Sequence, residues 1–318
     1  MGETGRITLE RIEAAAEAID PVFRNTPQFV CEPLSKALGV RLALKVETVN
    51  PLRSFKGRGA SWLLATMAES EPLMCASAGN FGQAMAYACR PRNVPLTVYA
   101  ATAANPLKLE RMRAMGATVV LHGEDFDAAK TEGRRVAAAR GVRFVEDGVD
   151  PEPSEGAGSI GLELLDFSEP LDAIVIPLGN GALLAGVATV LKARRPELRI
   201  VAAQAMGAPA MTESLRRGEL VVHDRIDTIA DGIGIREPAP EALADLRGLV
   251  DECLLTSDEA MIRAMRLLHV HAGIVAEPSG AAGIAVVLER PDQFAGQRVA
   301  TIVGGGNLTP EQMERWLA

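Results

Sequence analysis

The sequence predicts an α/β protein built from two open, three-layer α/β/α domains with mostly parallel sheets. Short β-prone runs alternate with helical runs along most of the chain, which is typical of βαβ units and a parallel sheet. At about 150 residues per domain, a length of 318 residues indicates two domains. Because 48% of the residues are hydrophobic, the chain can fill two buried cores.

The first part of the chain predicts helices around a single strand. Apolar residues over 9–19 recur at helical spacing, and Thr8 precedes them as an N-cap. A short helix over 32–38 and an apolar strand over 40–46 follow. After a short connection, a helical pattern covers 60–68. The connection therefore joins the end of a strand to the start of a helix.

The middle of the chain alternates regularly between the two kinds of element. It predicts strands over 73–76, 96–100, 117–121 and 142–145 and helices over 80–90, 105–115 and 125–140. Turn-forming residues over 147–154 then predict a loop, and we place a domain crossing there. We therefore expect residues 72–149 to form a small domain and residues 1–71 with 150–318 to form a large one.

The second half repeats the alternation. It predicts strands over 173–177, 199–204 and 299–303 and helices over 182–195, 209–217, 257–272 and 280–289. Ser257 is expected to cap its helix, and Thr309-Pro310-Glu311-Gln312 has the pattern of a capping box. These elements complete the sheet of the large domain.

Charge and composition exclude several classes of function. A formal net charge of −8 and the lack of a basic stripe argue against a nucleic-acid partner. No apolar run reaches the roughly 18–20 residues of a membrane span, and the N-terminus lacks the apolar core of a signal peptide. The four cysteines and four histidines show no metal-ligand spacing. We expect a cytoplasmic protein without a metal site.

The most informative stretch is Ser54-Phe55-Lys56-Gly57-Arg58-Gly59-Ala60, at the junction of strand and helix. A lysine placed after an aromatic residue and before two glycines can be partly desolvated, which frees its amine for Schiff-base chemistry. Most lysines at helix starts are merely solvated, so the stretch alone does not decide between the two interpretations. Arg58 is expected to be a structural charge partner.

Two further glycine-containing stretches support the chemical interpretation. Ser77-Ala78-Gly79-Asn80 and Gly179-Asn180-Gly181-Ala182 each open a predicted helix, whose free N–H groups attract an anion. The second stretch matches neither the phosphate-loop nor the dinucleotide fingerprint. One amine with two anion sites suits an aldehyde cofactor that carries a phosphate and an amino-acid substrate that carries a carboxylate.

The order of these motifs resembles threonine dehydratases, serine dehydratases and serine racemases, which are fold-type II pyridoxal-phosphate (PLP) enzymes. The resemblance covers nearly the whole chain. It also includes Gln83, Glu277-Pro278-Ser279-Gly280-Ala281-Ala282 and Gly304-Gly305-Gly306-Asn307. It implies a fold like that of the tryptophan synthase β-subunit, PLP as cofactor, an amino-acid substrate and a homodimer.

The resemblance also implies a role for each motif. Lys56 is expected to bind PLP covalently and to remove the substrate's α-proton, and Phe55 is expected to pack against the pyridine ring. The phosphate is assigned to Gly179, Asn180, Gly181, Ala182 and Leu183, and the phenolic oxygen to the Asn80 amide. The substrate carboxylate is assigned to Ser77, Gly79, Asn80 and Phe81, while Glu277 and Gly304 complete the cofactor site.

The chain departs from these relatives at four informative positions. Serine racemases carry a serine in place of Ala78 and use it as a second acid or base, so Ala78 favours elimination. Relatives place Ser, Thr or Cys against the pyridine nitrogen where this chain has Gly304. Gln204 replaces a cation-binding glutamate, which argues against activation by divalent metals. Arg53 raises the possibility of a substrate with a second acidic group, such as 3-hydroxyaspartate.

We therefore predict a PLP-dependent ammonia-lyase that converts L-threonine or L-serine into a 2-oxo acid and ammonia by β-elimination. Racemisation, hydroxyaspartate dehydration, β-replacement and threonine-synthase-like chemistry remain open as alternatives within the same fold. A PLP-binding protein without catalytic activity is the alternative outside enzymology. Product analysis distinguishes all of these.

Overall fold

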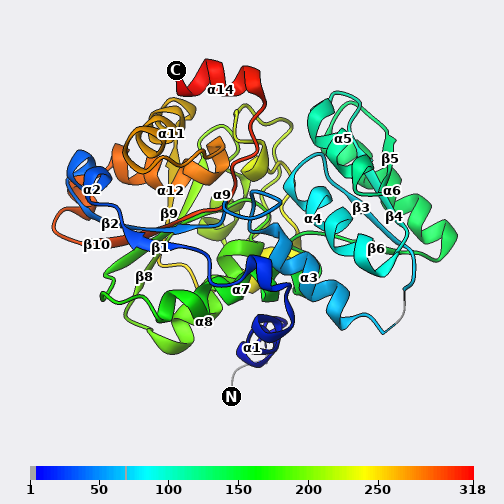
Figure 1. The fold of residues 1–318 in the computed structure, drawn as a ribbon, viewed down its shortest axis with the longest axis horizontal. Helices are drawn as coiled ribbons and strands as arrows, with labels where there is room; N and C mark the ends of the chain where they lie inside the picture. The colour runs from blue at the N-terminus through cyan, green and yellow to red at the C-terminus, as the bar shows by residue number, and fades with distance from the viewer. Residues whose placement is uncertain (1–4, 69) are drawn as a thin grey trace.

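The computed structural model describes residues 5–68 and 70–318, so positions 1–4 and 69 of the predicted large domain lie outside the described residues. The described strands form two sheets, one with six strands and one with four. The two sheets lie at opposite sides of the molecule, and each has helices packed around it (Figure 1). The chain is thus a mixed α/β protein with mostly parallel sheets, as predicted.

The six-stranded sheet joins strands from both ends of the chain in the order β1-β2-β10-β7-β8-β9. Its strands are β1 (Gln28–Val30), β2 (Arg41–Val46), β7 (Ala173–Pro177), β8 (Arg199–Ala205), β9 (Glu252–Thr256) and β10 (Arg298–Val303). All neighbours pair in parallel except β1 and β2. Because Val46 pairs with Val303, the loops that follow β2 and β10 leave the sheet side by side.

Helices cover both faces of this sheet because its strands alternate their apolar side chains between two cores. Val175 packs into the core beneath α2 (Glu32–Leu38), α11 (Asp258–Ala272) and α12 (Pro278–Glu289). Its neighbours Ile174 and Ile176 pack into the opposite core, against α7 (Pro151–Leu165) and α8 (Ala182–Arg194). The outer helices α1 (Leu9–Ala18) and α14 (Pro310–Leu317) pack on α7 and α11.

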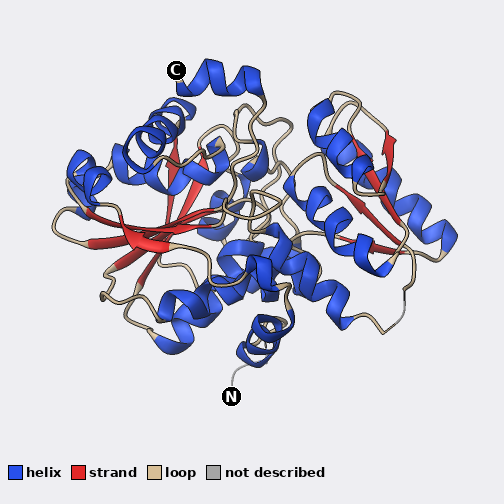
Figure 2. Cartoon of the chain, in the orientation of Figure 1, coloured by secondary structure: helices blue, strands red, loops and turns tan. Residues whose placement is uncertain are grey.

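The four-stranded sheet is parallel throughout and has the order β5-β4-β3-β6. Its strands are β3 (Leu73–Ala76), β4 (Leu96–Ala100), β5 (Thr118–Leu121) and β6 (Arg143–Val145). Cys75 and Val98 face the core shared with α3 (Lys56–Thr66), α4 (Asn80–Cys89) and α5 (Pro106–Ala114). Met74 and Tyr99 face α6 (Phe126–Arg140) on the other side. Figure 2 shows the strands of both sheets enclosed between helices.

Most predicted elements are confirmed, with bounds that shift by one or two residues, but the helix predicted over 60–68 begins four residues earlier, at Lys56. The caps at Thr8 and Ser257 accept the expected backbone hydrogen bonds, and Thr309 with Gln312 forms the predicted capping box. The helix predicted over 209–217 is α9 (Ala210–Arg217). The structure adds the short helices η1 (Pro21–Phe23), η2 (Arg90–Arg92), η3 (Asp231–Ile233), α10 (Pro240–Leu246) and α13 (Pro291–Phe294).

The prediction of a loop over 147–154 is confirmed for 147–150 but wrong for 151–154, because α7 begins at Pro151. Proline is a turn former, but it is also favoured at the first position of a helix, which is its position here. Most residues of α7 are buried, so the helix has no exposed polar face and its sequence lacks the amphipathic pattern that would predict a helix. Its glycines allow close packing: a side chain at Gly156 would lie 2.5 Å from the Gly59 Cα atom.

The structure places every strand of the four-stranded sheet between Leu73 and Val145. The division of the chain into domains at 72 and 149 stays a prediction.

Among the described residues, no helix is both long enough and apolar enough to cross a membrane.

Candidate active site

A cavity of about 770 Å³ opens where the carboxyl ends of strands from both sheets meet. Its lining comes from the loops after β3, β6, β7 and β10, from the start of α3 and from the segment 231–241. The carboxyl ends of parallel strands are the usual position of ligand sites in open α/β sheets. The cavity is therefore the candidate site.

Lys56 is the first residue of α3 and projects into this cavity. Its backbone N–H donates to Ser54 Oγ at 3.3 Å, which fixes the start of the helix. Its Nζ donates to Asp147 Oδ2 at 2.6 Å and lies 4.6 Å from the centre of the Phe55 ring. With only 15% of its side chain exposed, Lys56 is enclosed between an aromatic ring and a carboxylate.

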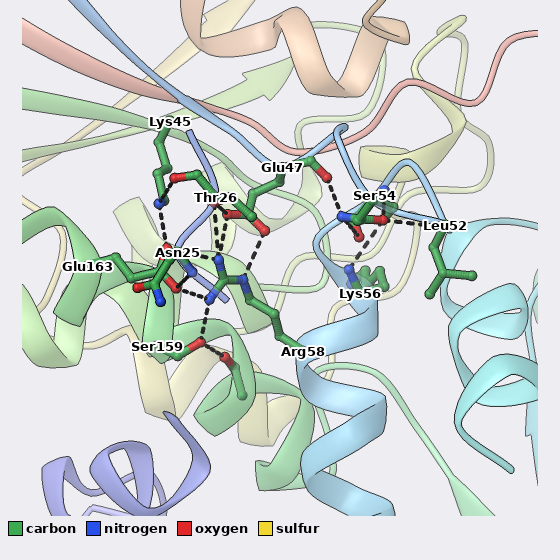
Figure 3. Close-up of polar contacts among 12 residues, drawn as sticks. Asn25, Thr26, Lys45, Glu47, Leu52, Ser54, Lys56, Arg58, Ser159 and Glu163 are labelled. Atoms are coloured by element: carbon green, nitrogen blue, oxygen red, sulfur yellow. Dashed lines mark hydrogen bonds and ion pairs between the residues drawn. The ribbon is translucent and has the colours of Figure 1, made fainter. Parts of the chain in front are cut away.

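A buried cluster of charges holds α3 in place one half-turn beyond Lys56 (Figure 3). The fully buried Arg58 donates to Glu47 at 2.9 Å and to Glu163 at 2.6 Å, and Lys45 donates to Glu163 at 2.5 Å. Burial opposes the charge of Arg58, but the two carboxylates outweigh it and raise its pKa. Burial lowers the pKa of Lys45, despite its partner. The geometry agrees with the structural role expected for Arg58.

The loop between β7 and α8 presents a row of backbone amides to the cavity. Gly181 is the N-cap of α8 with φ +94°, a conformation that favours glycine. The first hydrogen bond of the helix comes from Ala185 N to Gly181 O at 2.8 Å, so the amides before it have no partner within the helix. A side chain at Gly179 would lie 3.0 Å from the Ile233 Cα atom. The loop thus forms a narrow anion site at a helix N-terminus.

A second helix start, that of α4, faces the cavity from the other sheet. Its N-cap is Gly79, whose N–H donates to Ser77 Oγ at 3.1 Å, so Ser77 stands just before the cap. The Asn80 amide donates to Glu277 Oε1 at 2.6 Å, and its oxygen accepts from Asn307 Nδ2 at 2.8 Å. These bonds connect three motifs that lie far apart in the sequence.

Glu277 is buried near a positive charge, that of Lys108, and a negative charge, that of Asp231. Burial raises its pKa to about 7, the positive charge of Lys108 opposes this, and the negative charge of Asp231 adds to it. Lys108 Nζ donates to Asp231 Oδ2 at 2.6 Å. Glu277 therefore carries a proton under mildly acidic conditions and an ionised carboxylate under basic ones.

Gly304 follows the end of β10 and has no side chain to fill the space beside Phe55. A Cβ atom at Gly304 would lie 3.3 Å from Phe55 Cδ1 and 3.8 Å from Leu183 Cδ2. Ser279 also lines the cavity, and its buried hydroxyl has no hydrogen-bond partner among the described residues. Since buried hydroxyls are normally satisfied, Ser279 indicates a polar ligand in the cavity.

All the residues predicted for the site line this one cavity. They are Phe55, Lys56, Ser77, Gly79, Asn80, Phe81, Gly179, Asn180, Gly181, Ala182, Leu183, Glu277 and Gly304. Arg53, which suggested an acidic substrate, does not line it. Asp147, Lys108 and Asp231 were missed, because none belongs to a motif and each gains meaning only from a partner distant in sequence.

Comparison with known proteins settles the family. The family model described as "Pyridoxal-phosphate dependent enzyme" matches residues 19–305. The chain belongs to this family. Its cofactor is pyridoxal phosphate, and the fold is that of the fold-type II enzymes, as the resemblance of the motifs implied.

Among curated relatives, the L-threonine ammonia-lyase of Thermotoga maritima is 33% identical over 312 residues, covering 97% of this chain and 78% of that protein. Among solved structures, the processed form of threonine deaminase isoform 2 from Solanum lycopersicum is 28% identical with a TM-score of 0.87, covering 99% of this chain and 94% of that one. Maize serine racemase is 26% identical with a TM-score of 0.90, covering 98% and 96%.

The residues of the cavity fit pyridoxal phosphate. An amine can bond to the aldehyde, an aromatic face lies beside that amine, and a row of amides is available to the phosphate. A flat, polar ligand accounts for the Ser279 hydroxyl, which has no hydrogen-bond partner among the described residues, and for the close approach of Gly179 to Ile233. The described lining is therefore consistent with this cofactor.

Proposed function

We propose that this family member is an ammonia-lyase that converts L-threonine or L-serine into a 2-oxo acid and ammonia by β-elimination. The observation that carries the proposal is the position of Lys56, which faces a cavity holding two helix N-termini. The identity of about a third with an L-threonine ammonia-lyase over nearly the whole chain supports it.

Within this proposal, Lys56 anchors the cofactor and later takes the substrate's α-proton at Nζ. Bound pyridoxal phosphate withdraws electrons from the substrate's Cα and so makes that proton acidic. Phe55 would pack against the pyridine ring. The phosphate is assigned to the amides of the loop Gly179, Asn180, Gly181, Ala182 and Leu183.

The substrate is positioned by residues of the other sheet. We assign its carboxylate to the Ser77 hydroxyl and to the amides of Gly79, Asn80 and Phe81, at the N-terminus of α4. The hydrogen bonds that link the Asn80 side chain to Glu277 and Asn307 would hold its amide in place, and we assign this amide to the cofactor's phenolic oxygen. If the pyridine nitrogen lies at Gly304, as the resemblance implies, it would lack the side chain that relatives place there.

Racemisation is the second candidate, because maize serine racemase shares the fold with a TM-score of 0.90. A racemase must return a proton to the face of Cα opposite the lysine, and serine racemases use a serine for this. At that position the chain has Ala78, which lines the cavity but carries no exchangeable proton. Elimination requires only one face, so Ala78 supports the lyase.

We further propose that the protein is a cytoplasmic homodimer with a small domain over 72–149. The division into two sheets supports the domain proposal, because the cavity lies between them. The resemblance to dimeric relatives supports the oligomeric state. Sedimentation analysis tests it, and a single-chain mass would contradict it.

The test of function is a product assay on the purified holoenzyme with L-threonine, L-serine and 3-hydroxyaspartate. We expect 2-oxo acid and ammonia in equal amounts from L-threonine or L-serine, and no D-enantiomer. Lys56→Ala abolishes this turnover, whereas Lys192→Ala, at a lysine paired with Asp251 outside the cavity, leaves it unchanged. Accumulation of D-serine, or the absence of a 2-oxo acid from both L-threonine and L-serine, would overturn the proposal, and product from 3-hydroxyaspartate alone would favour that alternative substrate.

A further inference from the structure

The charged group in contact with Lys56 is a residue that no motif of the sequence contains. Asp147 Oδ2 accepts a hydrogen bond from Lys56 Nζ at 2.6 Å, and only 11% of the Asp147 side chain is exposed. Its other oxygen, Oδ1, is buried without a hydrogen-bond partner among the described residues. The Asn180 amide approaches Oδ2 at 3.4 Å. Lys56 is thus the cation that balances this carboxylate.

The backbone around Asp147 is held firmly in place. Glu146 N donates to Asp150 Oδ2 at 2.7 Å, which closes the loop after β6. Gly148 has φ +84°, and a side chain there would lie 2.5 Å from the Asn180 carbonyl oxygen. Because the loop packs directly on the glycine loop, the Asp147 backbone is fixed relative to that loop.

Most of the other charged groups that line the cavity have ion-pair or hydrogen-bond partners of their own. The ion pairs are Lys108 with Asp231, Arg134 with Glu146, Lys130 with Asp127 and Glu237 with Arg236. Glu277 accepts hydrogen bonds from Asn80 and Asn307, and Glu241 adds to the negative charge near Arg134. Among the described residues, Asp147 is the carboxylate in contact with Lys56.

A carboxylate at this distance favours whichever form of the lysine nitrogen carries a positive charge. The nitrogen is positive as the free ammonium and also when its C=N bond to the cofactor is protonated. The partial burial of both groups strengthens the attraction relative to water. We propose that Asp147 is the counter-ion of the Lys56 nitrogen and keeps its bond to pyridoxal phosphate protonated at neutral pH.

This makes Asp147 a positioning residue, which acts on the reaction through Lys56. It also gives the lysine a fixed partner after Nζ has taken the α-proton, because the resulting ammonium faces the same carboxylate. The inference depends on the cofactor of the family and not on the substrate, so it stands apart from the proposed lyase activity.

The test is a pH titration of the holoenzyme's absorption spectrum without substrate, since the protonated C=N bond absorbs at longer wavelength than the neutral one. In Asp147→Asn we expect the midpoint to fall by about one to three pH units relative to the wild type. Asp147→Glu, which keeps the charge, stays closer to the wild type. Glu13→Gln, which removes a carboxylate paired with Arg194 outside the cavity, is the control and leaves the midpoint unchanged. A midpoint in Asp147→Asn equal to that of the wild type overturns the inference.

A second measurement tests the inference even if the Asp147→Asn variant binds pyridoxal phosphate too weakly for a spectral titration. The apoproteins are mixed with pyridoxal phosphate at several pH values, and the bond is trapped with borohydride and quantified by mass spectrometry. Because only the unprotonated amine attacks an aldehyde, Asp147→Asn should react faster than the wild type at neutral pH. Equal rates over the whole pH range would contradict the counter-ion role.

Discussion

Replacement of Arg58 by methionine should destabilise the protein strongly, because Arg58 is fully buried between carboxylates. Its guanidinium contacts Glu47 Oε2 at 2.9 Å and Glu163 Oε1 at 2.6 Å, and the Glu47 side chain is itself fully buried (Figure 3). The variant leaves Glu47 without its cation in the interior. Removing one partner of a buried pair costs about 3–5 kcal/mol, a large share of the roughly 5–15 kcal/mol that stabilises a typical domain.

A second substitution shows whether charge or packing is responsible. The cluster contains two cations, Lys45 and Arg58, and two carboxylates, Glu47 and Glu163. The double variant Arg58→Met with Glu47→Gln removes one charge of each sign and leaves the pair of Lys45 and Glu163. We therefore expect the double variant to be more stable than the sum of the single changes by about 1–3 kcal/mol.

The assay is urea unfolding of the apoproteins, followed by circular dichroism. The control is Arg41→Met, which breaks the exposed pair of Arg41 with Glu169 and should cost about 0–1 kcal/mol. If the effects of Arg58→Met and Glu47→Gln simply add, charge balance does not explain why the cluster exists. A loss below about 1 kcal/mol for Arg58→Met would refute the reasoning outright.

Three further predictions follow from single residues. Burial raises the pKa of Glu277 from 4.5 to about 7. Between pH 4.5 and about 7, Glu277 is therefore protonated in the folded chain and ionised in the unfolded chain. Stability therefore falls as the pH rises through that window, and thermal unfolding of Glu277→Gln should show a smaller fall. Gly304→Ser should tighten binding of pyridoxal phosphate, because it restores the hydroxyl that relatives place against the pyridine nitrogen, while the Cβ at 3.3 Å from Phe55 Cδ1 requires only a small shift of that ring; weaker binding by fluorescence titration would contradict this. Arg53 has φ +50°, so Arg53→Gly should raise the free energy of unfolding by up to about 1 kcal/mol and leave substrate preference unchanged.

The sequence predicts the architecture well where strands and helices alternate with clear periods. Runs such as 173–177 and 299–303 are buried on both faces and read as continuous apolar strands, and the structure places them side by side in the sheet. The prediction fails at α7, because burial on most sides removes the amphipathic pattern. It also misses β1 and β9, which lie at the two edges of their sheet.

The site is predictable as far as motifs carry it. Lys56 and the two helix starts stand out because together they supply one amine and two anion sites. The partners of these motifs do not stand out: Asp147 lies 91 residues from Lys56, and Glu277 lies 197 residues from Asn80. Such contacts depend on the close approach of the two sheets, which the local sequence does not encode.

The central claim is that Lys56 bonds covalently to pyridoxal phosphate, and mass spectrometry tests it most directly. The purified holoenzyme is reduced with borohydride and digested, and the peptide that carries the added pyridoxyl phosphate is identified. The account predicts one modified peptide, containing Lys56, and a loss of 2-oxo acid formation by at least about a hundredfold in Lys56→Ala. A modification on another lysine, or full turnover by Lys56→Ala, would contradict it.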